Sequence, residues 1–170
     1  MTRPLCAIAT LLALLATTGP AFVRPRPRLL WNASASVPIG LYTVHPAGRL
    51  RIGELVVVLP PHALAQFLAG RRYLPEGVPM LKHVLALRGQ TVCRTGRVIS
   101  VDGIAMGTAL ERDTRGRPLP VWQGCQRIPV GDVFLMNRKS LYSFDGRYFG
   151  LLPTTTIIGR ADPIWTRRER

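Results

Sequence analysis

The sequence predicts a mainly β protein with antiparallel strands and one short helix, preceded by an apolar amino-terminal segment. Three observations support this fold class. Short β-branched runs recur along the chain and end at Gly, Pro or Asp-Gly breakers. Strands do not alternate with long helical patterns, so a parallel sheet is not expected. The 170 residues are near the size of one domain, and a composition of 47% hydrophobic and 19% charged residues excludes a disordered chain.

The first element is an uncharged, largely apolar run of 20 residues between Arg3 and Arg24. About 20 apolar residues suffice for a helix to cross a bilayer. Residues 1–23 are therefore predicted to form a transmembrane signal anchor. A cleaved signal peptide is the alternative, because residues 19–21 are small enough for a cleavage zone. A buried soluble helix is less favoured, because nothing marks a solvent-facing side.

The indications of membrane orientation disagree. Residues 24–28 contain three arginines, whereas only Arg3 precedes the apolar run, and this charge distribution keeps the carboxyl side in the cytoplasm. Cys93 and Cys125 are the only cysteines outside the apolar run. If they form a disulfide, the domain is expected in an oxidising compartment. A periplasmic domain with this disulfide is the prediction retained.

Residues 24–29 alternate Arg and Pro, which suits an extended linker, and residues 30–170 form the predicted domain. Residues 62–69 are predicted to be helical, because Pro61 suits a first helical position and Leu64, Phe67 and Leu68 share one face. Asp102 and Gly103 predict a two-residue hairpin turn. Residues 111–120 are polar and predict an exposed loop. The predicted strands cover residues 52–59, 84–87, 91–93, 97–101, 104–106, 133–136, 155–158 and 163–165.

The charge balance is strongly basic, with a net charge of +14. Nucleic-acid binding is one interpretation of such a charge. The arginines are scattered and the aromatic residues, at 7%, are not interleaved with them, so this interpretation is the weaker one. Three histidines and three cysteines lack the spacing of a metal site, so neither metal nor cofactor is expected.

Lys82 and Lys139 are the only lysines. Lys82 interrupts the apolar residues 78–87, where strand alternation would place it on one face with Val84 and Ala86. A buried, unpaired ammonium is costly, so such a lysine tends to become neutral and can act as a base. Lowering its pKa by two to three units corresponds to roughly 3–4 kcal/mol. Lys139 lies in a polar stretch and is predicted to be a solvated surface residue.

Ser34 and Ser36 lie just before Pro38 and Gly40 in the stretch NASASVPIGLY. A turn that contains proline can hold a hydroxyl at the surface, as a nucleophile requires. Serine before proline is also common in ordinary loops, and that interpretation is favoured when this stretch is considered alone.

Ser143, Asp145 and Arg147 alternate in the stretch SFDGR. In an extended segment they would project to one face, with Phe144 on the other. An Asp and an Arg two residues apart can pair and position a neighbouring hydroxyl. A purely structural ion pair at a turn is an equally good interpretation of this spacing.

Taken in order, these motifs resemble the signal peptidase family of Ser/Lys serine proteases. They are Ser-x-Pro-x-Gly over residues 36–40, Lys82 followed by an apolar strand and a Gly-containing turn, and Ser-x-Asp-Gly-Arg over residues 143–147. Residues 151–165 are similar to the closing strand pair of that family. Within that family, the sequence most closely resembles the conjugative-transfer signal peptidases of the TraF type. The features that carry this resemblance are the short anchor, the stretch SVPIGLY, residues 60–84 and the two cysteines. The resemblance covers residues 32–165.

The resemblance implies a membrane-anchored serine endopeptidase with its domain on the periplasmic face of the bacterial inner membrane. Ser36 would be the nucleophile and Lys82 the general base. The supporting residues would be Ser34 at the oxyanion hole, Ser143 beside Lys82, Asp145 and Arg147. The implied substrate is an exported precursor such as a conjugative pilin, processed by a monomer. Asn137 and Arg138 lie two residues further from the SFDGR segment than in general secretory enzymes, so neither is assigned a role.

Two rival functions remain at this stage. The first is a non-catalytic envelope or pilus-assembly module that keeps the fold without the activity. The presence of both Ser36 and Lys82 argues against it. The second rival is the basic nucleic-acid-binding protein considered above.

Overall fold

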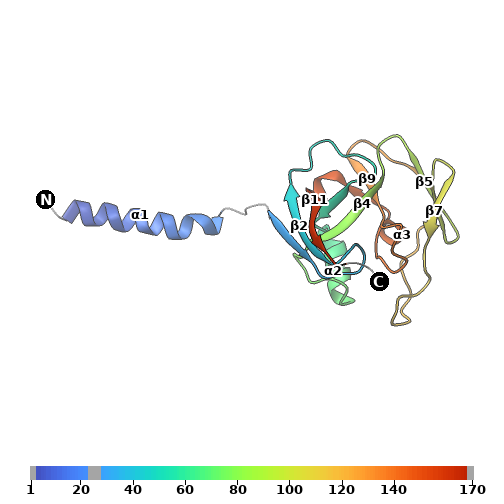
Figure 1. Cartoon of the computed structure of the whole chain (residues 1–170), viewed down its shortest axis with the longest axis horizontal. Coiled ribbons are helices and arrows are strands. Elements are labelled where there is room, and N and C mark those ends of the chain that lie inside the picture. Colours follow the sequence, from blue (N-terminus) through green and yellow to red (C-terminus); the bar gives the residue numbers. More distant parts are fainter. Residues whose placement is uncertain (1–2, 23–27, 168–170) are drawn as a thin grey trace.

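The computed structural model describes residues 3–22 and 28–167 (Figure 1). Most of the predicted Arg/Pro linker, residues 24–27, lies outside the described residues. So do residues 1–2, which belong to the predicted anchor, and Val23 at its end.

The amino-terminal apolar run forms helix α1 (Arg3–Phe22). Its large apolar side chains are more than half exposed, namely Ile8, Leu11, Leu12, Leu14 and Leu15. Among the residues described, no helix is both long enough and apolar enough to cross a membrane. The structure therefore does not confirm the predicted transmembrane anchor, which stays a prediction.

In the part of the chain that the structure describes, eleven strands form two sheets, and every strand pair is antiparallel. The larger sheet contains β1 (Leu29–Asn32), β2 (Gly40–His45), β3 (Leu55–Val58), β4 (Met80–Ala86), β9 (Asp132–Leu135), β10 (Leu151–Pro153) and β11 (Ile157–Thr166), in the order β1-β2-β11-β3-β4-β9-β10. The smaller sheet contains β5 (Thr91–Thr95), β6 (Val98–Val101), β7 (Ile104–Thr108) and β8 (Gly124–Arg127), in the order β7-β6-β5-β8. The predicted mainly β, antiparallel fold class is confirmed.

Short helical elements connect the strands. Helix α2 (His62–Gly70) confirms the predicted helix. Helix α3 (Gly146–Phe149) and the 3-10 turn η1 (Thr154–Thr156) are not predicted by the sequence patterns. The predicted strand over residues 155–158 is wrong in its first half, because the chain turns at η1, where the Thr156 hydroxyl donates to the Pro153 carbonyl. The described domain therefore has more than the single helix expected.

The strongest turn signal is confirmed. Asp102 and Gly103 connect β6 to β7 and both have positive φ angles, 49° and 81°. This conformation is the one that a two-residue hairpin turn requires and that the Asp-Gly sequence accommodates. The hairpin forms half of the smaller sheet.

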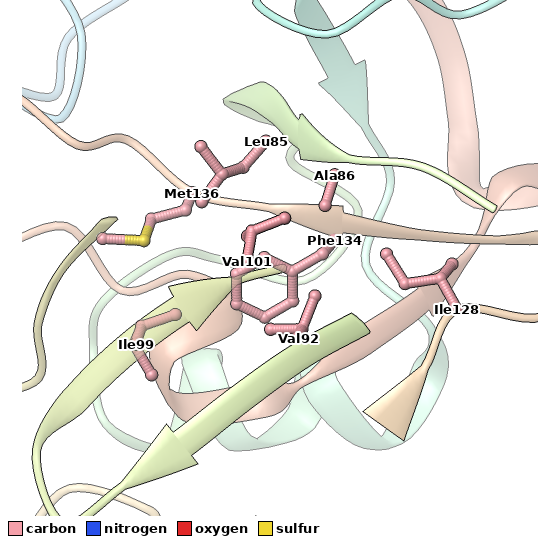
Figure 2. Packing of buried hydrophobic residues seen from close by; sticks show 8 residues of the cluster. All are labelled: Leu85, Ala86, Val92, Ile99, Val101, Ile128, Phe134 and Met136. Carbon is pink, nitrogen blue, oxygen red and sulfur yellow. The ribbon is translucent and has the colours of Figure 1, made fainter. Parts of the chain in front are cut away.

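One hydrophobic cluster lies between the two sheets and joins them (Figure 2). The larger sheet contributes Leu85, Ala86 and Phe134, and the smaller sheet contributes Val92, Ile99 and Val101. Ile128 and Met136 complete it. Because residues from both sheets are buried in one cluster, the smaller sheet is part of the same domain as the larger one.

Strand β4 carries Lys82 and has an irregularity that changes the predicted pattern. Lys82 pairs with Val56 of β3, and the register to β9 shifts between Val84 and Ala86. Val84 is in a cluster with Met80, two residues before Lys82, whereas Ala86 belongs to the cluster between the sheets. The prediction that Lys82, Val84 and Ala86 share one face is therefore wrong for Ala86, because a bulge reorients the strand there.

Cys93 of β5 and Cys125 of β8 are directly paired in the smaller sheet and form a disulfide. This confirms the predicted pairing. Cys6, in α1, is free and exposed.

We expect the double replacement of Cys93 and Cys125 by Ala to lower the free energy of unfolding by about 3–4 kcal/mol. The bond closes a loop with a sequence separation of 32 residues, and the expected loss follows from the entropy that it removes from the unfolded chain. Urea denaturation measures it. Cys6→Ala, which leaves the bond intact, serves as the control. A loss of less than about 1 kcal/mol would contradict the expectation.

Candidate active site

The two serines of the first motif lie in the loop between β1 and β2. Asn32, the last residue of β1, pairs with Gly40, the first residue of β2, so the strand register closes the loop at its base. Ser34 is exposed and Ser36 is half-buried. Their hydroxyl oxygens are 3.0 Å apart. The loop therefore presents a pair of hydrogen-bonded hydroxyls near the surface.

Gly40 is required at the base of this loop by the close approach of another strand. A β-carbon at this position would lie 2.1 Å from the carbonyl oxygen of Trp165 in β11 and 2.7 Å from the α-carbon of Thr166. Any other residue would push the two strands apart. The glycine of the Ser-x-Pro-x-Gly motif is thus explained by packing rather than by chemistry.

Lys82 lies in β4 with only 4% of its surface exposed. Its Nζ donates a hydrogen bond of 2.9 Å to the Ser143 Oγ. The residues two positions before and after it, Met80 and Val84, belong to a hydrophobic cluster. Lys139, by contrast, is exposed, as its polar surroundings predict. The two lysines therefore differ in the structure as the sequence predicts: Lys82 is buried and Lys139 is exposed.

Burial lowers the pKa of Lys82 from 10.5 to about 8. The negative Asp145 carboxylate opposes this change, and the positive Arg147 guanidinium adds to it. The neutral amine is consequently accessible near physiological pH, and it is the form that can accept a proton.

The segment that carries Ser143, Asp145 and Arg147 is not extended throughout, contrary to the prediction, because α3 begins at Gly146 directly after Asp145. Asp145 is the N-cap of α3, and its carboxylate accepts a hydrogen bond from the backbone N–H of Arg147. An aspartate favours such a cap, and it ends the extended conformation there. Because a helical turn begins after Asp145, the alternation of side chains along a strand does not describe where these three side chains lie.

The predicted pairing of Asp145 with Arg147 is confirmed. Arg147 Nε donates to Oδ1 at 2.8 Å and Nη2 to Oδ2 at 2.9 Å, and both residues are at most 1% exposed. The guanidinium also donates to the backbone carbonyls of Ser140, Leu141 and Ser143. A single buried ion pair thus holds the loop that presents Ser143 to Lys82.

Asn137 is one of the two residues of this region that the sequence analysis leaves without a role. Its backbone N–H donates to Asp145 Oδ2 at 3.0 Å. Its side-chain amide donates to the Leu81 carbonyl at 3.1 Å and lies 3.4 Å from the Ser143 Oγ. Asn137 therefore connects the lysine strand, the partner serine and the ion pair. A polar residue directly after the buried strand over residues 133–136 is the signal that could have identified it.

The predicted site residues form three groups in the structure. Ser34 contacts Ser36, Lys82 contacts Ser143, and Asp145 pairs with Arg147. No hydrogen bond joins Ser36 to Lys82 within residues 3–22 and 28–167. The residues next to them in the chain, Val37 and Leu81, belong to one hydrophobic cluster, together with Tyr42. The Ser36–Lys82 dyad remains a prediction.

The described residues contain no group of three or more His, Cys, Asp or Glu side chains that could hold a metal ion.

An antiparallel domain with a buried lysine beside a serine hydroxyl fits a peptidase of the signal-peptide-processing class. The family described as "Signal peptidase, peptidase S26" matches residues 1–166, and the chain belongs to this family. The chain is 35% identical over 145 residues to the conjugal transfer protein TraF of Agrobacterium fabrum, covering 79% of this chain and 81% of the relative. It is 32% identical to a plasmid transfer protein TraF of Escherichia coli, with the same coverage of both chains.

Among solved structures, a signal peptidase I from Enterococcus faecalis V583 aligns with a TM-score of 0.39 and 15% identity. The alignment covers 66% of this chain and 96% of that protein.

Proposed function

We propose that this protein is a serine endopeptidase in which Ser36 is the nucleophile and Lys82 the general base. The observation that carries the proposal is Lys82, a buried lysine with a lowered pKa and a hydrogen bond to a serine hydroxyl. Membership of the signal peptidase family supports the same assignment. A neutral lysine that activates serine is an established variant of the catalytic triad.

The mechanism follows from these groups. The neutral Lys82 amine removes the proton of the Ser36 hydroxyl as the Ser36 Oγ attacks the scissile carbonyl carbon. The C–N bond then breaks, the leaving amine takes the proton from the Lys82 ammonium, and an ester to Ser36 remains. Water, or another amine, attacks this ester and releases the acyl group while Lys82 again relays the proton. The Ser36 backbone N–H and the Ser34 hydroxyl would stabilise the oxyanion.

Three further residues are proposed to support the base. Ser143 orients the Lys82 amine through its hydroxyl, and Asp145 holds Arg147, which fixes the Ser143 loop. Arg147 donates to both carboxylate oxygens of Asp145, and its positive charge offsets part of the effect of that carboxylate on Lys82. Burial remains the largest cause of the lowered Lys82 pKa, which keeps the neutral amine accessible.

The proposed substrate is an exported precursor protein of a conjugative system, such as a pilin. Relatives of this chain are named conjugal and plasmid transfer proteins, which supports that assignment and an association with the cell envelope. We place the domain on the periplasmic face of the inner membrane, since it contains a disulfide and disulfides persist in oxidising compartments.

Mass spectrometry of a co-expressed pilin-like precursor tests the function directly. We expect a defined cleavage product with the wild-type chain and none with Ser36→Ala. The same product in the presence of Ser36→Ala would overturn the assigned nucleophile. An intact precursor with the wild-type chain would favour the non-catalytic assembly module.

The cleavage rate should rise about tenfold per pH unit up to about pH 8 and then level off, because only neutral Lys82 accepts a proton. A second test measures stability instead of cleavage. The pKa of Lys82 is lower in the folded chain than in the unfolded chain, about 8 against 10.5, so the folded chain binds fewer protons between these two pH values. The free energy of unfolding should therefore rise with pH across this window, and Lys82→Met should lack the rise. A rate already constant above pH 6 would contradict the proposal.

We also propose that α1 attaches the protein to the membrane, because its side chains Ile8, Leu11, Leu12 and Leu15 are apolar and more than half exposed. The full chain should sediment with membranes in high salt and start at or near Met1 by amino-terminal sequencing. A mature form that starts after Ala21 and is washed off membranes would contradict this attachment.

A further inference from the structure

The side-chain amide of Asn32 organises the loop that carries Ser34 and Ser36. Asn32 is only 8% exposed. Its Oδ1 accepts the backbone N–H of Ser34 at 3.2 Å and the Ser34 hydroxyl at 3.0 Å. Its Nδ2 donates to the carbonyl oxygens of Ser34, Val37 and Pro38 at 2.8–3.1 Å. One buried amide thus binds both ends of the loop.

The orientation of this amide is determined by its partners. The three carbonyl oxygens can only accept, so the atom that faces them must be the NH₂ nitrogen. The backbone N–H of Ser34 can only donate, so the atom that faces it must be the amide oxygen. A flipped amide would lose the bonds to the three carbonyls and the bond to the Ser34 N–H, so the ambiguity common for asparagine does not arise here.

This orientation determines the direction of the next hydrogen bonds. Ser34 has a single hydroxyl hydrogen, and its contact with the Asn32 oxygen requires that Ser34 donate it there. In the 3.0 Å contact between Ser34 and Ser36, Ser34 must therefore accept. Ser36 consequently donates its hydrogen to Ser34, and the chain of bonds runs from Ser36 through Ser34 to Asn32.

We propose that Asn32 is a positioning residue for the nucleophile, which acts through Ser34 and the loop without touching the reacting atoms. The inference rests on the proposed function of Ser36. In the resting enzyme, the Ser36 hydrogen points to Ser34. Acylation begins when this O–H turns to the Lys82 amine and the Ser34 hydroxyl leaves Asn32 to donate to the oxyanion. The Ser34 N–H stays bound to Asn32, so the loop keeps its shape while the two hydroxyls turn.

The first test is Asn32→Asp, which keeps the size and the Oδ1 acceptor but places an oxygen against the three carbonyls. With a precursor peptide as substrate, we expect kcat to fall by about 10- to 100-fold while KM changes by less than about twofold. Gln123→Glu is the matched control, because the amide of Gln123 binds the backbone of Gly96 in the smaller sheet with both of its atoms. Its kcat should stay within about twofold of wild type.

The second test does not depend on activity. Amide hydrogen exchange followed by NMR should show a protected Ser34 N–H in the wild type and in Gln123→Glu, and loss of this protection in Asn32→Ala. Equal exchange of the Ser34 amide in wild type and Asn32→Ala would overturn the proposal, whether or not the chain cleaves a precursor.

The outcomes separate this inference from the proposed function. If Ser36→Ala abolishes cleavage while Asn32→Asp keeps the wild-type kcat, the positioning role is overturned and the function stands. If Ser36→Ala still cleaves, the assigned nucleophile fails and the kinetic role of Asn32 fails with it.

Discussion

Replacing Lys82 by Met should abolish precursor cleavage. Met has nearly the same volume and suits the apolar surroundings of β4, so the fold should survive, but it removes the only proton acceptor proposed for Ser36. Losses of about 10⁴-fold or more are typical when a member of such a catalytic group is removed. The appearance of the cleaved precursor, measured by mass spectrometry over time, gives the ratio of rates.

Lys82→Arg is the sharper variant, because arginine keeps the positive charge but does not lose its proton near neutral pH. It should be inactive as well. Lys139→Met is the matched control, since it removes the same side chain from an exposed position and should cleave at nearly the wild-type rate. Cleavage by a folded Lys82→Arg variant would rule out the dyad mechanism. If Lys139→Met also lost cleavage, the effect of replacing Lys82 would not be specific to that lysine and would not identify it as the base.

Replacing Arg147 by Met should lower the free energy of unfolding by about 3–5 kcal/mol, because it leaves the fully buried Asp145 carboxylate without its partner. The variant also removes the hydrogen bonds to the carbonyls of the Ser143 loop. Urea denaturation at neutral pH measures the loss. Adding Asp145→Asn should recover part of it, since the second change removes the unpaired charge and keeps a residue that can cap α3.

Arg160→Met provides the matched control for this ion pair. Arg160 is partly exposed and lies 3.5–3.7 Å from Asp162 and Glu54. A pair of this kind contributes about 0–1 kcal/mol. If Arg147→Met cost no more than Arg160→Met, the buried pair would not be what holds the Ser143 loop.

Much of the fold could be predicted because its main strands carry strong local signals. The β-branched run that becomes β3, the Asp-Gly turn between β6 and β7, and the apolar face of α2 each depend on neighbours in sequence. Strands β1, β8 and β10 are only three or four residues long, and β8 is exposed throughout. Such strands form because a partner strand is present, which is information that the local pattern does not contain.

The candidate site was predictable to the extent that its residues belong to motifs. Ser34, Ser36, Lys82, Ser143, Asp145 and Arg147 were named from three short stretches. The sequence assigns no role to Asn32 or Asn137, because their roles depend on contacts made through side-chain amides across a loop or between strands. Only the folded chain reveals which carbonyls and hydroxyls those amides reach.

The buried arginines also bear on the nucleic-acid interpretation of the basic charge. Arg94 is 2% exposed, and its guanidinium donates to the Arg147 carbonyl at 2.6 Å. Arg94 and Arg147 are therefore parts of the core rather than of a surface that could meet phosphates. Part of the net positive charge of the sequence thus comes from arginines that are buried and form hydrogen bonds in the core.

The disulfide lies at the free edge of the smaller sheet, in a strand whose four residues are all exposed. Lys82, Ser143 and Asp145 come from the larger sheet and from the chain that follows β9, and no hydrogen bond from β8 reaches them among the described residues. We therefore expect the oxidation state of the two cysteines to change the stability of the fold more than the positions of Lys82, Ser143 and Asp145. A newly made chain that still carries both thiols should already bring these three side chains together, and the later cross-link should make the fold more stable.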